Sequence, residues 1–306
     1  MLSSHVEELA GFKVVDFDPE KPVKAKLMYR LALDYDAAES GSTMPDLIAK
    51  YLQQPLAKES LGLIIGSWGD PAGTDSSRIV EALVAARTKL SALRYLFIGD
   101  ITSEESEISW IQQTDMSPVF SAYPQLEYFR VRGNTNLSLG KPKNDALKTL
   151  IIETGGLSAE VVRQVLRASL PNLEHLELWL GTDNYGGDST IDDLKALLDG
   201  KIFPKLKYLG LRDSENADEI AQAIASSPIL MRIKTFDLSL GTLSDAGAQH
   251  LLDSAGMKEL KVLDLHHHYL SDAMMKKLRK LPIEVNLDEQ EDAGADGEDR
   301  YVAVSE

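Results

Sequence analysis

The stretch L-K-V-L-D-L, Leu260 to Leu265, decides the fold, because its pattern of apolar residues returns along the chain. It recurs as L-E-H-L-E-L from Leu173, L-K-Y-L-G-L from Leu206 and I-K-T-F-D-L from Ile233. Further units begin at Leu93, Leu126 and Leu147, with weaker ones at Met28 and Ser60. Nine such units are more than a random globular chain of 306 residues usually has, so the sequence predicts an array of repeats.

Each unit predicts a short strand, because strand side chains alternate between two faces. In the opening stretch, Leu263 and Leu265 point to one face, and Asp264 and His266 point to the other. Successive strands of this kind, joined through helices, predict a parallel sheet with one face in the core and one face open.

Helix signals stand between the strands. Thr190 can cap a helix over 191–199, with Asp193 completing a capping box and Gly200 following the end. Ser158 can cap a helix that continues to Arg167. The near copies L-S-D-A-G-A from Leu243 and L-S-D-A-M-M from Leu270 each offer a serine cap.

These elements together predict an α/β fold. It is a right-handed solenoid of about nine repeats, with a parallel β-sheet on its concave face and helices on its convex face.

The L-x-x-L-x-L units and the L-S-D-A-G-A helix starts make residues 26–287 resemble a leucine-rich-repeat protein, in the style of the ribonuclease-inhibitor-like class. The runs V-V-D-F-D, W-L-G-T-D-N-Y-G-G-D and R-Y-V-A-V-S-E are also similar to an uncharacterised family of bacterial cytoplasmic repeat proteins. That resemblance implies the fold and carries no activity. The asparagine ladder usual after the strand is missing, with Asp213 and His267 or His268 near its place, so the loop hydrogen bonds must differ.

Three segments follow from this reading. Residues 1–25 are predicted to cap the first repeat, and residues 26–287 to form the solenoid. Residues 288–306 form an acidic tail, flexible over 288–300, in which 301–304 offer a short returning strand. The tail could also lie on concave arginines as an autoinhibitor, an idea that rests on opposite charge alone.

Composition excludes several kinds of function. The chain has no cysteine, which rules out disulfides, cysteine-bound zinc and a thiol nucleophile. The formal net charge of −16 argues against nucleic-acid and anionic-membrane partners, both of which need a basic surface. We find no signal peptide pattern and no apolar run long enough to span a membrane, and therefore expect a cytoplasmic protein.

The outward positions of the strands are rich in aromatic, arginine and acidic residues, the types that anchor protein interfaces. They are graded, with aromatic and basic residues in the early units and acids and histidine in the last. The predicted partner-binding residues are Tyr95, Phe97, Tyr128, Arg130, Arg132, His175, Glu177, Trp179, Tyr208, Arg212, Asp237, Asp264 and His266.

Two loops at the strand ends add candidate contacts. G-S-W-G-D carries Trp68, and G-T-D-N-Y-G-G-D carries Asp183, Asn184 and Asp188. The second loop has the oxygen ligands that a cation such as calcium prefers, but not the spacing of an EF-hand, and a tight polar turn explains it as well.

The sequence therefore predicts a non-enzymatic module that binds a protein partner through the concave face and neighbouring loops, without a cofactor or metal. The alternative is a metal-dependent enzyme or accessory protein that uses the rim loops and His266 with His268, which can share a face. A third possibility is a structural subunit of a larger assembly. The partner and the oligomeric state stay open.

Overall fold

The computed structural model describes residues 2–294 and 299–305, which form an α/β fold. The strands are β1 (Glu8–Leu9), β2 (Phe12–Asp16), β3 (Leu27–Leu33), β4 (Gly62–Trp68), β5 (Tyr95–Ile98), β6 (Tyr128–Arg132), β7 (Thr149–Glu153), β8 (His175–Gly181), β9 (Tyr208–Ser214), β10 (Thr235–Asp237), β11 (Val262–Asp264) and β12 (Glu284–Asn286). The helices are α1 (Tyr35–Glu39), α2 (Met44–Tyr51), α3 (Ser77–Ala85), α4 (Ser117–Ala122), α5 (Ala159–Leu166), α6 (Ile191–Leu198), α7 (Ala217–Ala225), α8 (Asp245–Asp253) and α9 (Asp272–Leu278).

The strands form a mostly parallel sheet whose order follows the sequence from β1 to β12. The hairpin of β1 and β2 is antiparallel. The pairs from β2 to β6 and from β8 to β12 are parallel. The sequence prediction of an α/β fold built on a parallel sheet is confirmed.

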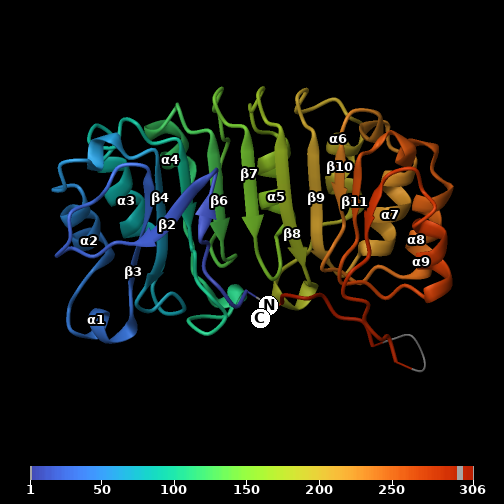
Figure 1. Cartoon of the computed structure of the whole chain (residues 1–306), viewed down its shortest axis with the longest axis horizontal. Coiled ribbons are helices and arrows are strands. Elements are labelled where there is room, and N and C mark those ends of the chain that lie inside the picture. The colour runs from blue at the N-terminus through green and yellow to red at the C-terminus, as the bar shows by residue number, and fades with distance from the viewer. Residues whose placement is uncertain (1, 295–298, 306) are drawn as a thin grey trace. The chain divides into compact units, whose positions relative to one another are not determined.

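The chain divides into two compact units. Unit 1 comprises residues 2–150 and 168–170, and unit 2 comprises residues 151–167 and 171–305. Within each unit the helices lie on one side of the strands: Figure 1 shows α5 behind β8, and it shows α2, α8 and α9 at the outer sides of the strands next to them. We call the opposite surface of the strands the helix-free face of that unit.

The repeated motif builds the core of both units. Leu263 and Leu265 have no exposed surface, and the equivalent Leu209 and Leu211 are buried in the same way. The register between β10 and β11 pairs Phe236 with Leu263, so apolar positions of successive repeats stack on one another.

The predicted helix starts are present. The Thr190 and Asp193 side chains form the capping box of α6, and Gly200 follows the helix with a φ of 68°. Ser158 caps α5, and Ser244 and Ser271 cap α8 and α9. These side chains accept hydrogen bonds from otherwise unpaired amides of the first turn.

A left-handed residue recurs at regular intervals near the ends of the strands in unit 2, within β9 and after β10 and β11. Asp213, Leu240 and His267 have φ angles of 54°, 66° and 55°. Their amides donate to the carbonyls of Ser239, His266 and Asp288, each in the neighbouring repeat. Backbone bonds thus take the place of the missing asparagine ladder.

The C-terminal segment returns to unit 2, but the strand expected over 301–304 is not formed. Val302 and Val304 are buried, the Ala303 amide donates to the Leu240 carbonyl, and the Val304 amide donates to the Asp213 carboxylate. Residues 295–298 of the tail predicted to be flexible lie outside the described residues.

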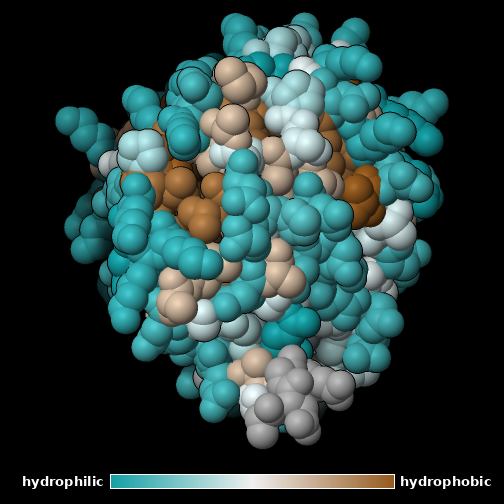
Figure 2. Space-filling view, turned by 90° about the vertical axis from the view of Figure 1, so that its right-hand side faces the viewer, coloured by the Kyte–Doolittle hydropathy of each residue, from teal (hydrophilic) through white to brown (hydrophobic). Residues whose placement is uncertain are grey.

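Figure 2 shows one side of the molecule, on which apolar side chains are set among hydrophilic ones. The last strand of the sheet order is β12. Glu284 is exposed and Asn286 is half-buried on either side of Val285. Charged and polar residues on an edge strand discourage pairing with another chain. In the part of the chain that the structure describes, no helix has the length and apolar character needed to cross a membrane.

Candidate functional site

The helix-free face of unit 2 brings together polar residues from four neighbouring strands. Strand register aligns Glu177 of β8 with Gly210 of β9, Gly210 with Asp237 of β10, and Asp237 with Asp264 of β11. Arg212 lies two residues after Gly210 on β9, on the same face, and is paired with Trp179 of β8. We call this set, with His175, Tyr208, Ser239 and His266, the unit 2 polar cluster.

Glu177 is the centre of the unit 2 polar cluster. Its carboxylate accepts hydrogen bonds from the Trp179 indole at 2.7 Å and from the Arg212 guanidinium at 2.8 Å. The His175 Nε2 atom lies 3.3 Å from its other oxygen. Burial alone would raise the pKa of Glu177, but His175, the Arg212 charge and the Trp179 hydrogen bond lower it to about 2. Glu177 is therefore a carboxylate at neutral pH.

Arg212 connects Glu177 to the second acid, Asp237. The Arg212 Nε atom lies 3.3 Å from Asp237 and donates to the Ser239 hydroxyl at 2.9 Å. Burial alone would lower the pKa of Arg212, but the two carboxylates raise it, so the guanidinium stays charged.

Tyr208 completes the network from the side. Its hydroxyl donates to Asp237 at 2.5 Å, and its ring stacks on His175 with 3.8 Å between centroids. Burial and the negative charges of Glu177 and Asp237 raise the pKa of Tyr208, which keeps the hydroxyl protonated as a donor.

Gly210 makes room for the bridge between the two acids. A Cβ atom at this position would stand 3.1 Å from Glu177 Cγ, 3.2 Å from the Tyr208 ring and 3.5 Å from Arg212 Cδ. The missing side chain thus lets the Arg212 side chain reach both Glu177 and Asp237.

Asp264 and His266 form the more accessible end of the cluster. The His266 Nδ1 atom lies 2.7 Å from Asp264, and both residues are half-buried. The hydrogen bond to Asp264 raises the pKa of His266.

The helix-free face of unit 1 is apolar and covered. Phe97 has no exposed surface, and the guanidinium of Arg130 lies 4.3 Å from its ring centroid. Arg132 is also buried and donates to the Ile101 carbonyl at 2.6 Å. Tyr95 and Tyr128 are half-buried, with ring centroids 6.5 Å apart.

The cover is the chain's own N-terminal segment, residues 2–9, which we call the strap. Val6 and Leu9 belong to one apolar cluster with Met28, Ile64 and Phe97. Figure 1 shows the first, violet-blue part of the chain in front of the strands of unit 1, on the side away from the helices.

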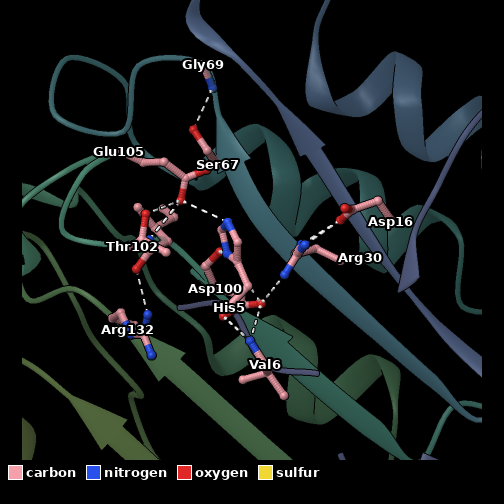
Figure 3. Close-up of polar contacts among 11 residues, drawn as sticks. His5, Val6, Asp16, Arg30, Ser67, Gly69, Asp100, Thr102, Glu105 and Arg132 are labelled. Carbon is pink, nitrogen blue, oxygen red and sulfur yellow. Dashed lines mark hydrogen bonds and ion pairs between the residues drawn. The ribbon is translucent and has the colours of Figure 1, made fainter. Parts of the chain in front are cut away.

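Asp100, which follows β5, holds the start of the strap (Figure 3). Its fully buried carboxylate accepts the Val6 amide at 3.2 Å and the Arg30 guanidinium at 3.1 Å. His5 Nδ1 lies 3.1 Å from the Asp100 carbonyl, and its Nε2 lies 3.5 Å from Glu105. Neither His5 nor Asp100 is predicted as a site residue from the sequence; an acid directly after the glycine that ends a strand, as in Gly99–Asp100, is the one signal that could have indicated Asp100.

The predicted rim residues have separate structural roles. The Trp68 indole donates to the Thr74 carbonyl at 2.7 Å, and Trp68 is buried. Asp188 accepts the Ala159 amide at 2.6 Å at the start of α5, and it is exposed, as Asp183 and Asn184 are. One oxygen of Asp188 is thus used at the start of α5.

The three consecutive histidines do not share one face. Because His267 is left-handed, alternation breaks, and His268 is buried while His266 stays half-buried. His268 Nδ1 accepts the Leu270 amide at 3.2 Å, and Nε2 lies 3.3 Å from the Leu287 carbonyl. Among the described residues, no group of three or more histidine and acidic residues is arranged to hold a metal ion.

Comparison with known proteins places the chain among relatives of known structure. It is 36% identical to a Bacteroides fragilis protein whose crystal structure was determined as a structural genomics target, with a TM-score of 0.83. The match covers 90% of this chain and 77% of that protein. The chain belongs to the same family as that Bacteroides fragilis protein. No family model and no curated protein matches the chain.

Proposed function

We propose that this protein is a right-handed leucine-rich-repeat solenoid of about nine repeats that acts as a non-enzymatic, cytoplasmic protein-interaction module. The repeat assignment is supported by Asp213, Leu240 and His267, left-handed residues at a regular spacing that donate to the next repeat. The binding assignment rests on the unit 2 polar cluster.

The observation that carries the proposal is a hydrogen-bonded charge network on a sheet face without helices. Glu177, Arg212 and Asp237 are ion-paired and mostly buried. Buried ion pairs contribute little to stability compared with well-packed apolar residues, so stability alone does not explain such a network. Binding explains it, because a network already in place holds Tyr208 and Arg212 in fixed orientations for a partner.

The charge of the unit 2 polar cluster favours a basic partner. It holds three carboxylates and one guanidinium: Arg212 pairs with Glu177 and Asp237, whereas Asp264 pairs with His266. Cationic side chains of a partner would therefore be attracted to the Asp264 end, which Arg212 does not reach in the contacts described.

The loops next to this face offer a second contact. A cavity of about 480 Å³ lies at the starts of α6 and α7. Its apolar part is lined by Leu180, Leu194 and Ile220. The exposed acids Asp192 and Glu219 also line it. A lysine or arginine side chain of the partner matches this combination of apolar wall and carboxylate.

The test is co-purification of the full chain with bacterial proteins, identification of the recovered partner, and direct titration of that partner. We expect the double variant His175→Ala/Asp264→Asn to lower affinity at least about tenfold, since both side chains are half-buried contact residues. These positions are preferable to Trp179, because Trp179 is buried, whereas the His175 and Asp264 side chains keep 30% and 25% of their surface exposed.

The matched control is Glu160→Gln, which removes one charge from the exposed side of α5. The control should bind like the unchanged chain. Equal affinity for the double variant and the control would contradict the proposal. Weaker binding at higher salt would support the assigned basic partner.

A further inference from the structure

The floor beneath the strap is an apolar surface on strands β3, β4 and β5. Met28, Ile64 and Phe97 have at most 1% of their surface exposed. They face Val6 and Leu9, together with Phe12 and Val14 of β2. Without the strap, part of this floor would be open to water, and an exposed apolar patch of that kind commonly binds another chain.

The polar end of the floor does not depend on the strap. Asp100 keeps the Arg30 guanidinium at 3.1 Å, and Arg30 in turn pairs with Asp16 at 2.6 Å. Glu105 accepts hydrogen bonds from the Thr102 amide and hydroxyl. Departure of the strap therefore removes one amide donor from Asp100 and leaves no unpaired buried charge, which is the costly outcome.

The strap itself is held by few bonds. Strand β1 has two residue pairs with β2, Glu8 with Lys13 and Leu9 with Phe12. Ser3, Ser4, Glu7 and Glu8 are exposed, and the His5 side chain keeps 29% of its surface. Strand β1 pairs with β2 alone, so the attachment of the strap relies on the apolar contacts of Val6 and Leu9 and on a few hydrogen bonds. These bonds run from the Val6 amide to Asp100 (Figure 3), from the Ser103 amide to the Leu2 carbonyl and from the Val14 amide to the Glu7 carbonyl.

We propose that the strap is a displaceable occupant, and that the groove it covers in unit 1 is a second binding site, for an extended peptide segment of a partner. The strap defines the chemistry of that segment. It needs two apolar side chains three residues apart, as Val6 and Leu9 are, and a backbone amide for Asp100. A histidine or basic residue before the first apolar position would lie beside Glu105, as His5 does.

This site goes beyond the proposed function and is separate from the unit 2 polar cluster. The groove is lined by Met28, Ile64 and Phe97, and it recognises apolar side chains and a main-chain amide. The cluster recognises charge. The strap and a partner segment compete for one groove, so occupancy by the strap lowers the apparent affinity by the fraction of time the groove is open.

The test uses the full chain with Val6→Asp and Leu9→Asp, which weakens strap docking without shortening the protein. The probe is a fluorescent peptide of the native sequence of residues 2–14, L-S-S-H-V-E-E-L-A-G-F-K-V. We expect the double variant to bind this peptide at least about tenfold more tightly than the unchanged chain. A peptide carrying the same two aspartates should not bind either protein.

Hydrogen exchange on the unchanged full chain gives an independent measurement should the double variant fold poorly. The Val6 and Leu9 amides should exchange at least about 100-fold faster than the β4 amides, because the strap opens without global unfolding. Equal exchange of strap and β4, or a folded double variant with no peptide binding, would overturn the proposal. Concentration-dependent dimerisation of the double variant with no peptide binding would also overturn it, in favour of a second copy as occupant.

Failure of the proposed groove in unit 1 can be distinguished from failure of the proposed function, which depends on unit 2. His175→Ala/Asp264→Asn should leave peptide binding in unit 1 unchanged, because those residues belong to unit 2. Loss of peptide binding in that variant would show that one site serves both ligands.

Discussion

The helix-free faces of the two units are built from the same strand pattern but carry different residues: one is apolar and covered, and the other is charged and hydrogen-bonded. In unit 1 the outward residues include Ile64 and Phe97, and a segment of the same chain covers them. In unit 2 they include Glu177 and Asp237, and Arg212 ties them into a network of hydrogen bonds. The core positions that define the repeat are the same in both, so the residues between them decide what each face can bind.

The comparison shows that different interactions fix the side chains of the two faces, apolar burial in unit 1 and hydrogen-bonded charges in unit 2. Apolar burial is non-directional, so the proposed exchange of the strap requires of its replacement mainly apolar side chains. Hydrogen-bonded charges require fixed geometry, so the proposed partner of unit 2 must match the network in the position of its charges. Three substitutions would break or sharpen this contrast.

The largest expected effect is the loss of the apolar centre of unit 1 in Phe97→Ala. Removal of a fully buried aromatic ring should lower the free energy of unfolding by about 3–5 kcal/mol, since it leaves a cavity and removes the contact with Arg130. Urea denaturation followed by circular dichroism measures it. The matched control is Tyr35→Ala, because Tyr35 is 58% exposed and its loss should change stability by less than about 0.5 kcal/mol. A loss below about 1 kcal/mol at Phe97 would mean that its burial contributes little.

The second effect is electrostatic and depends on pH. Glu177 has a folded-state pKa of about 2, below its ordinary value of 4.5, so it stabilises unit 2 above pH 4.5 and loses that contribution as the pH falls toward 2. Glu177→Gln should therefore cost about 3 kcal/mol at pH 7 and almost nothing at pH 2. Denaturation at both pH values checks this, with the exposed Asp192→Asn as control. If Glu177→Gln lowers the free energy of unfolding equally at both pH values, Glu177 stabilises the fold through packing and not through its charge.

The smallest effect concerns the accessible end of the unit 2 polar cluster. Asp264 raises the pKa of His266, so their pair stabilises the fold below the ordinary pKa of 6.5 and loses that contribution as the pH rises through the raised value. His266→Gln should cost less than about 1 kcal/mol, because the pair is partly exposed. Thermal unfolding at pH 5.5 and at pH 9 should show the larger difference at the lower pH. The reverse order would contradict the assigned ion pair.

The strands and helix starts could be predicted because their signals are local. The apolar positions of Leu260–Leu265 predict β11, and Thr190 with Asp193 predicts the start of α6 from three residues of spacing. Every outward residue predicted in unit 2 lies on a strand except His266, which is the second residue after β11.

The remaining features depend on contacts between distant residues. Val6 contacts Asp100 across 94 positions, and no local pattern encodes that pairing. Likewise, Arg132 is predicted from the sequence to be an exposed contact residue. In the structure its guanidinium donates to the Ile101 carbonyl and is buried. His268 is misplaced for a third reason, because the left-handed His267 breaks the alternation on which the face assignment depends.

The glycine between Glu177 and Asp237 makes the spacing of these two acids depend on a position without a side chain. A methyl group at Gly210 would press on Glu177 Cγ at 3.1 Å and on the Tyr208 ring at 3.2 Å without adding or removing any charge. Alanine at this position would therefore shift Glu177 and Tyr208 while every charged residue of the unit 2 polar cluster is kept. The geometry of the proposed binding surface thus depends on a residue that itself carries no charge.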